Sequence, residues 1–296
     1  MRRHDTLALL AAAATGVQVG AALVASRFVI HDIGPASLAF LRYAIAVLCL
    51  APFVIAGARV RFSFRDLLAV MGLGIVQFGI LIALLNLGLQ FISSTRAALL
   101  FSTFPLMTMV IAAFLGRERL TGAKTAGVLL TIVGVAVALG EGLIRSNGTN
   151  DFFGALLVLT AALCGAVSSV LYRPYLSRYP TLPVGASAML ASILFLAGPA
   201  GLEGLFTDGT HLDQRGWIVV ILIGLSSGVG YILWLWALKH TTPTRVTVFL
   251  SVSPITASLL GALILNEPFT FGVFLGLAGV VSGLWLATRT GADERR

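Results

Sequence analysis

The sequence predicts an all-α, polytopic membrane protein whose ten transmembrane helices form two five-helix halves of opposite orientation. Of its 296 residues, 58% are hydrophobic and only 11% are charged, whereas a soluble domain is typically about 25% charged. The charges lie between long apolar stretches, and the pattern of residues 94–134 returns 149 residues later. The apolar stretches predict the spans, the charges predict their orientation, and the recurrence predicts the two halves.

The spans follow from the length of the apolar stretches. A membrane-spanning helix needs about 20 mostly apolar residues, because it rises about 1.5 Å per residue through a hydrocarbon core about 30 Å thick. Charged and turn-forming residues divide the chain into ten such stretches. They are expected at Thr6–Val29, Ala36–Ala56, Asp66–Gly88, Ser94–Leu115, Gly122–Gly140, Phe152–Tyr172, Pro183–Gly201, Gly216–Leu238, Pro243–Leu265 and Thr270–Thr288. The connections are short, so we expect neighbouring helices to be antiparallel.

The first stretch follows the basic segment MRRHDT, as the apolar part of a signal peptide would. It runs without a charge from Thr6 to Ser26 and shows no small-residue cleavage motif, so we interpret it as the first span. Lys and Arg then set the orientation. With the N-terminus inside, fifteen of the 20 Lys and Arg fall in inner segments, four fall in outer segments, and Arg42 lies within the second span. Both termini are therefore predicted to be cytoplasmic.

A shift of 149 residues superimposes the fourth and fifth spans on the ninth and tenth without a gap. The superimposed identities include Thr95–Arg96 on Thr244–Arg245, Pro105 on Pro254 and Glu118 on Glu267. We expect one repeat at residues 1–145 and the other at 146–296. Because five is an odd number of spans, the second repeat enters the membrane inverted, as in secondary transporters that bind substrate near the midplane. The alternative is a structural duplication without transport.

Composition also excludes several functions. The net charge is +8, but the positive residues stand singly or in small groups between apolar runs, which indicates topology rather than nucleic-acid binding. Cys49 and Cys164 lie inside apolar runs, and there is no CxxC, HExxH or histidine cluster, so we expect no metal and no cofactor. All twelve acidic residues fall at helix ends or in loops, which leaves no membrane carboxylate for proton–cation antiport. A membrane-embedded enzyme or scaffold remains the alternative of another class.

The end of each half carries a motif that resembles a known family. The stretches "FLGRERLTGAKTAGVLLTIVGV" (Phe114–Val135) and "LILNEPFTFGVFLGLAGVVSGL" (Leu263–Leu284) each place an acidic residue before a Thr and a glycine-spaced helix. This pattern is similar to that of EamA-type transporters of the drug/metabolite transporter superfamily, and "PASLAFLRYAIAVLCLAP" (Pro35–Pro52) resembles their second span. One departure is "GVQVG" (Gly16–Gly20), where many members carry Trp-Gly. In length and segment character the chain looks most like the YddG-like aromatic amino-acid exporters.

The resemblance covers essentially the whole chain and implies its cellular role. It implies a multi-pass protein of the bacterial inner membrane that works in the lipid bilayer as a monomer or homodimer. It also implies export of amino acids or similar small metabolites, with aromatic or other apolar side chains. Efflux of drug-like apolar compounds is the alternative within transport.

Two helix faces and one isolated amide are the candidates for the substrate site. The two faces lie in the third and eighth spans, where polar and aromatic side chains recur at helical spacing. The isolated amide lies in the first span. The predicted substrate-binding residues are Gln18, Gln77, Phe78, Leu81, Ser227, Tyr231 and Trp234. An unpaired amide in hydrocarbon costs several kcal/mol, so Gln18 and Gln77 must face protein, a cavity or water. The structural alternatives are interhelical hydrogen bonds for the two glutamines and an interfacial aromatic belt for Trp234.

A cavity with this lining would be neutral, partly apolar and aromatic. It suits a zwitterion with an apolar side chain better than a sugar phosphate, which requires several convergent Arg or Lys. It also lacks the carboxylate that a cationic drug requires. The sequence therefore favours an amino acid as the substrate.

Two prolines interrupt the fourth and ninth spans at equivalent positions. Pro105 and Pro254 cannot donate a backbone hydrogen bond, and Ser102 and Ser251 are placed to help satisfy the carbonyl groups that the prolines leave free. We predict that these four residues form two hinges, each serving the gate on one side of the membrane.

Three charged residues are assigned structural roles rather than catalytic ones. Glu118 and Glu267 occupy equivalent positions at helix ends, where they can stabilise a helix terminus or pair with arginines. Arg42 lies about seven residues into the second span, and we assign it to snorkelling or to an ion pair. The alternative for Arg42 is an anchor for a substrate carboxylate.

Overall fold

A computed structural model describes residues 3–57, 60–117, 122–144, 149–267 and 271–289, and every regular element within them is helical. The elements of the first half are α1 (Arg3–Val29), α2 (Pro35–Ala56), α3 (Phe64–Gly74), the π-helix η1 (Ile75–Ile80), α4 (Leu81–Gly88), α5 (Ser94–Phe101), α6 (Phe104–Phe114) and α7 (Gly122–Ile144). Those of the second half are α8 (Thr149–Arg178), α9 (Thr181–Leu202), α10 (Gln214–His240), α11 (Pro243–Val248), the 3₁₀ turn η2 (Phe249–Val252), α12 (Ser253–Leu265) and α13 (Phe271–Arg289).

Eight helical stretches in the described part of the chain are long and apolar enough to cross a membrane. They match eight predicted spans, with α3, η1 and α4 making one span, α5 and α6 another, and α11, η2 and α12 a third. The predicted fifth and tenth spans are α7 and α13, whose apolar stretches within the described residues, Thr125–Gly134 and Phe274–Gly283, are shorter. The chain is thus a multi-pass membrane protein. The ten-span count stays a prediction.

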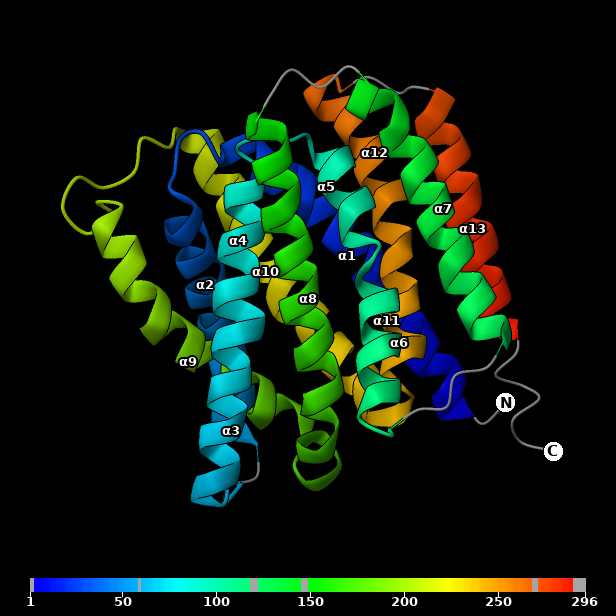
Figure 1. Ribbon diagram of the computed structural model, residues 1–296. Helices are drawn as coiled ribbons and strands as arrows, with labels where there is room; N and C mark the ends of the chain where they lie inside the picture. Colours follow the sequence, from blue (N-terminus) through cyan, green and yellow to red (C-terminus); the bar gives the residue numbers. More distant parts are fainter. Residues whose placement is uncertain (1–2, 58–59, 118–121, 145–148, 268–270, 290–296) are drawn as a thin grey trace.

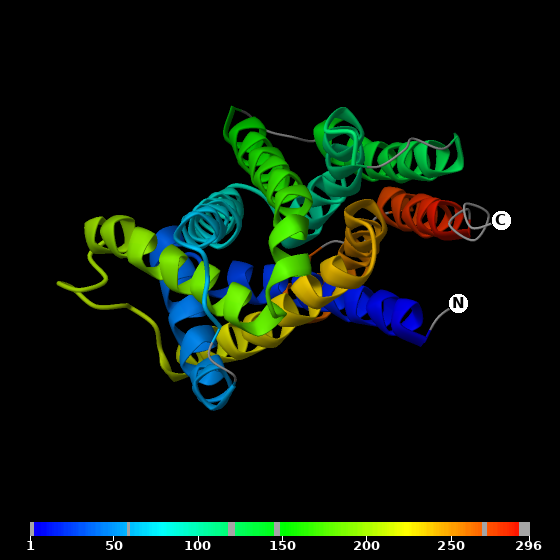
Figure 2. The same cartoon turned by 90° about the horizontal axis from the view of Figure 1, so that it is seen from below.

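The helices form one bundle in which α1 begins on the same side as α13 ends (Figure 1). We call this side the inner end of the bundle and the opposite side the outer end, following the predicted orientation. Seen along the bundle, α7 and α13 stand side by side at one edge, away from α2 and α9 (Figure 2). Their contact needs small residues, because a Cβ on Gly279 of α13 would lie 2.7 Å from the Cα of Gly134 of α7.

The packing of the two halves is reciprocal. Helix α5 packs against α12 while α6 packs against α11, and α1 packs against α10 while α8 packs against α4. In the α7–α13 pair, Gly134 faces the carbonyl of Gly276, and Gly283 faces that of Gly127. In each of these pairs of contacts, moving the first-half residue forward by 149 positions and the second-half residue back by 149 gives the other contact.

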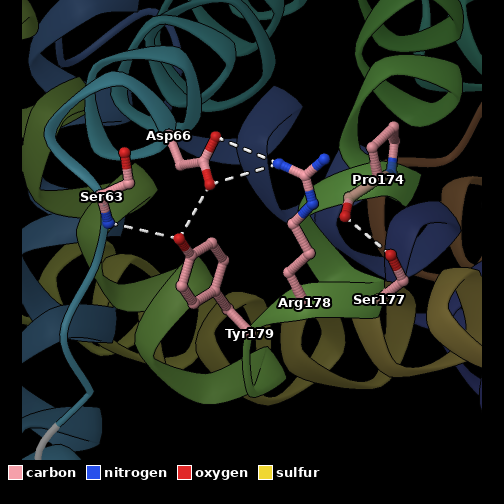
Figure 3. A network of polar contacts seen from close by, with 6 residues as sticks. All are labelled: Ser63, Asp66, Pro174, Ser177, Arg178 and Tyr179. Atoms are coloured by element: carbon pink, nitrogen blue, oxygen red, sulfur yellow. Dashed lines mark hydrogen bonds and ion pairs between the residues drawn. The ribbon is translucent and has the colours of Figure 1, made fainter.

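The sixth span is longer than predicted. The sequence prediction ends it at Tyr172, but α8 continues to Arg178. The added turn contacts the start of α3 at the inner end (Figure 3). The Tyr179 hydroxyl donates to Asp66 at 2.8 Å and accepts from the Ser63 amide at 3.2 Å, and the Arg178 guanidinium lies 3.4 Å from the Asp66 carboxylate. These polar contacts hold the extension in place.

Both predicted interruptions of the fourth and ninth spans are present, but as helix starts rather than kinks. Helix α5 ends at Phe101 and α6 begins at Phe104. Helix α11 ends at Val248, η2 continues to Val252, and α12 begins at Ser253. Pro105 and Pro254 therefore stand in the first turn of a new helix, where a backbone N–H has no intrahelical partner to lose.

The two serines beside these prolines do not act as predicted. The Ser102 hydroxyl donates to the carbonyl of Ala98 at 3.0 Å, not to the carbonyl that Pro105 leaves free. The Ser251 hydroxyl is buried without a partner among the described residues. New helix starts make this backbone repair unnecessary.

Candidate functional site

A narrow cavity, partly open to solvent, lies between the two halves and leaves about 30 Å³ for the centres of water-sized molecules. Its walls come from α1, α2, η1, α4 and the α5–α6 break on one side, and from α10 and η2 on the other. Sites for small molecules typically occupy about 300–1,000 Å³. The cavity lies well below that range in this conformation, so a metabolite of amino-acid size requires its walls to move apart.

Most of the predicted substrate-binding residues lie in the wall of this cavity. Six of them do so: Gln18, Gln77, Leu81, Ser227, Tyr231 and Trp234. Trp234 is only 2% exposed, so it does not belong to an interfacial aromatic belt. That these six residues contact substrate stays a prediction.

Phe78, the seventh predicted residue, is not in the cavity wall. It is fully buried, with its ring centroid 5.2 Å from that of Tyr43 and 4.7 Å from that of Tyr231. The reason is the π-helix η1, in which the Leu81 amide bonds to the carbonyl of Val76, five residues back. In this wider turn Phe78, three residues before Leu81, packs behind the wall, while Gln77 and Leu81, four residues apart, both line it.

The two buried glutamines have different surroundings. The Gln18 amide donates to the Ser226 hydroxyl at 3.4 Å, so Gln18 both lines the cavity and joins α1 to α10. Gln77 is 3% exposed, and its side-chain oxygen has no partner within the described residues. The Ser227 hydroxyl, 1% exposed, is also without a partner there. Unpartnered polar atoms are uncommon in protein interiors, and these two share one cavity.

Arg42 lies in the cavity wall, and both structural interpretations of it are wrong. Its side chain is 4% exposed and does not snorkel to solvent. One terminal nitrogen donates to the Ser26 hydroxyl at 2.7 Å, while Nε has no partner. No described carboxylate lies within 4.0 Å of the guanidinium. Among the described residues, Arg42 is the one Lys, Arg, Asp, Glu or His in the lining, and its charge is uncompensated there.

The cavity changes character along its length. The Arg42 carbonyl lies beside Gly224 of α10, 3.1 Å from the position of a Cβ there. From Gly224, α10 runs towards the inner end, so Ser227, Tyr231 and Trp234 follow about one, two and three turns further in. Trp234 meets the Phe104 ring at a centroid distance of 6.1 Å. The wall is therefore charged near its outer end, polar in the middle and aromatic near its inner end.

Several lining residues were not predicted. They are Thr15, Val19, Ala22, Leu23, Ser26, Ile82, Leu85, Asn86, Phe101, Phe104 and Leu250. Asn86 donates to the carbonyl of Pro35 at 3.0 Å. Like Gln77, it is a polar amide within an apolar span, and this pattern could have predicted it from the sequence. Phe101, Phe104 and Leu250 stand beside the predicted hinges, which places both helix breaks against the cavity.

Glu267 joins the two halves at the outer end. Its carboxylate accepts four hydrogen bonds at 2.8–3.1 Å, from the backbone amides and hydroxyls of Ser94 and Thr95 at the start of α5. Asn266, in the left-handed conformation with φ 52°, turns the chain back so that Glu267 reaches this position. Its partners are thus a helix terminus rather than an arginine. Glu118, the equivalent residue, lies outside the described residues.

A second carboxylate contact at the outer end has the same form. Glu203, after α9, accepts hydrogen bonds from the amides of Ala36 and Ser37 and from the Ser37 hydroxyl, at 2.7–3.0 Å. Arg96 also pairs there with Asp151 at 2.8 Å. Sequence spacing did not reveal these contacts, because their partners lie far apart along the chain.

Known proteins resemble this chain along its whole length. A solved crystal structure superimposes with a TM-score of 0.76 at 22% identity, with full coverage of both chains, which shows a shared fold. An "Uncharacterized transporter" of Archaeoglobus fulgidus is 30% identical over 272 residues, covering 91% of this chain and 94% of that protein.

Two relatives have names that mention amino acids. A "Probable amino-acid metabolite efflux pump" of Escherichia coli K12 is 28% identical over 296 residues, covering 96% of this chain and 94% of the relative. A "Probable terminal-alkyne amino-acid exporter" of Streptantibioticus cattleyicolor is 30% identical over 224 residues, covering 73% of each. The profile of the EamA-like transporter family matches this chain twice, over residues 6–140 and 152–289. With both halves matched, the chain belongs to the EamA-like transporter family.

Proposed function

We propose that this transporter exports amino acids with aromatic or other apolar side chains, or closely similar metabolites, across the bacterial inner membrane by alternating access. The observation that carries the proposal is Arg42, an uncompensated guanidinium in a cavity whose other walls are neutral and partly aromatic. A buried charge without a partner is costly. A substrate carboxylate supplies the missing partner.

The chemistry of the wall narrows the substrate class. A single arginine matches one carboxylate, whereas a sugar phosphate requires more positive charge. A cationic drug would meet Arg42 and no described carboxylate in the lining, and an uncharged drug would leave Arg42 unpaired. The names of the Escherichia coli and Streptantibioticus cattleyicolor relatives also point to amino acids. These points favour an amino acid over the drug-efflux alternative.

The reciprocal packing supports alternating access between inverted halves. A two-fold axis makes residue i of one unit contact j of the other, and j contact i. The Gly134–Gly276 and Gly127–Gly283 contacts have this relation under the 149-residue shift. Helices α7 and α13 run antiparallel (Figure 1), so an axis that relates them would lie across them, in the plane of the membrane. Secondary transporters with this symmetry rock one half against the other around a central site.

Counterflow in proteoliposomes tests the proposed function. Vesicles loaded with unlabelled phenylalanine are expected to accumulate labelled phenylalanine and leucine in a saturable way. Labelled lysine and glutamate should accumulate little, because their second charge finds no counter-ion among the described lining residues. Exchange should proceed without a pH gradient, since that lining offers no carboxylate or histidine as a proton carrier. Protein-free vesicles are the control. No counterflow of any amino acid, or a strict need for a pH gradient, would contradict this proposal.

The helix breaks beside the cavity yield a directional prediction. If each break serves the gate on one side, Pro105→Ala and Pro254→Ala should change inward and outward flux unequally, and in opposite senses. The reason is that alanine restores a backbone donor and allows the two helix segments to fuse into one. Flux is measured in each direction in vesicles of defined orientation. Equal, wild-type rates in both directions for both variants would leave the prolines a packing role only.

A further inference from the structure

We propose that the cavity holds its substrate as a zwitterion in one orientation. The carboxylate contacts Arg42, the ammonium contacts the Gln77 and Ser227 side-chain oxygens further in, and the apolar side chain points towards Phe104 and Trp234. This inference rests on the proposed function and adds the groups that recognise the α-amino group. In this orientation Gln77 and Ser227 select for the α-amino group of the substrate.

Charge alone would select a different substrate. A monocarboxylate neutralises Arg42 completely, whereas an amino acid brings a new positive charge into a low-dielectric space that lacks a described carboxylate. A buried ammonium is tolerated only if hydrogen-bond acceptors replace its lost hydration. The question is therefore whether the cavity holds free acceptors within reach of a carboxylate bound to Arg42.

Two fully buried acceptors in the described wall have no partner, the side-chain oxygens of Gln77 and Ser227. Other buried serines, including Ser102, Ser169 and Ser192, donate to a carbonyl of their own helix at 2.7–3.0 Å. Ser227 has the same local option on α10, yet its hydroxyl has no partner among the described residues. Unpartnered hydroxyls such as Ser253 also occur elsewhere, but outside the cavity wall. Within the described wall the unpartnered oxygens come from both halves, Gln77 from the first and Ser227 from the second.

The backbone holds Gln77 in this position. The π-turn separates Gln77 from Phe78, whose ring packs between those of Tyr43 and Tyr231. Because that packing fixes the turn, Gln77 keeps its place in the wall. π-Turns often occur at functional sites, and here the turn presents an amide that has no structural bond to make.

The order of the groups along the cavity fits an α-amino acid. Ser227 lies three residues inward from Gly224, the neighbour of Arg42, which is about 4.5 Å along the helix. Gln77 precedes Phe78, which packs on Tyr231 about one turn further in. In an α-amino acid the carboxylate and ammonium share one carbon atom and the side chain extends beyond them. Tyr231, Trp234 and Phe104 would then surround that side chain.

Competition in the phenylalanine counterflow assay tests the orientation. The competitors are 3-phenylpropionate, which lacks the ammonium, and phenethylamine, which lacks the carboxylate. In the wild type each should compete about 10- to 100-fold more weakly than phenylalanine. In Gln77→Met and Ser227→Ala the affinity for phenylalanine should fall about tenfold, while that for 3-phenylpropionate stays within about twofold. Ser169→Ala, which removes a buried hydroxyl outside the cavity wall, is the matched control and should behave as wild type.

The outcomes separate this inference from the function on which it rests. If phenylalanine is exchanged but 3-phenylpropionate competes equally well in the wild type, the orientation is wrong and export of amino acids stands. The orientation is also wrong if Gln77→Met and Ser227→Ala both keep the wild-type ratio of the affinity for phenylalanine to that for 3-phenylpropionate. If the wild type exchanges no phenylalanine, the proposed function fails together with the inference. The wild-type comparison decides the question even if one variant does not fold.

Discussion

Replacing Arg42 by glutamine is expected to lower the kcat/KM of amino-acid exchange at least about 30-fold. Losing one partner of a buried charged pair typically costs about 2–5 kcal/mol, and each 1.4 kcal/mol is a factor of ten. Lysine at this position keeps the charge but not the forked geometry, so Arg42→Lys should retain part of the activity. The measurement is initial counterflow at several substrate concentrations.

The stability of the same variant should change in the opposite direction. In the empty protein the Arg42 charge is buried without a described counter-ion, so Arg42→Gln removes a desolvation cost and should leave the melting temperature in detergent unchanged or raised. Arg215→Gln removes an exposed positive charge at the outer end of α10 and is the matched control, with wild-type exchange. Near-normal exchange by Arg42→Gln would show that Arg42 does not hold the substrate.

Removing the charge of Glu267 is expected to have the largest effect on stability. Glutamine in its place can accept through only one oxygen, so Glu267→Gln loses half of the four contacts at the start of α5 and the favourable interaction of a carboxylate with a helix N-terminus. Hydrogen bonds to charged groups are each worth about 1.5–3 kcal/mol, so the two lost bonds correspond to about 3–6 kcal/mol for the variant. The melting temperature in detergent should fall by at least about 6 °C.

Asp66→Asn is the matched comparison at the inner end. Its arginine partner is 63% exposed, and exposed pairs contribute about 0–1 kcal/mol, so the melting temperature should fall by no more than about 3 °C. A fall for Glu267→Gln that is no larger than that for Asp66→Asn would show that the carboxylate at the start of α5 is dispensable.

The sequence was sufficient for those parts of the fold that depend on local pattern. Stretches such as 214–240 are apolar over the full length that a membrane-spanning helix needs. The 149-residue repeat can be seen in the sequence alone, for example in Pro105 and Pro254. The same reasoning placed Gln18 and Gln77 against protein or cavity, because an amide cannot face lipid. Both line the cavity.

The failures concern properties that depend on distant partners. An ion pair for Arg42 was a reasonable expectation from one span, but whether a carboxylate lies nearby depends on the folding of the whole bundle. The contact of Glu267 with Ser94 spans 173 residues, and no spacing rule connects them. Phe78 was misplaced because α- and π-turns require the same residue types, and packing around the turn decides between them.

The π-turn at Ile75–Ile80 also has a consequence for comparing this chain with its relatives. A π-turn is an α-helix with one residue inserted, so the third span carries one residue more than a plain helix between the same ends. A relative that crosses the membrane here with an uninterrupted α-helix should align with a one-residue gap near Gln77. Such a gap would mark a historical change in which side chains face the cavity, made without altering the length of the crossing.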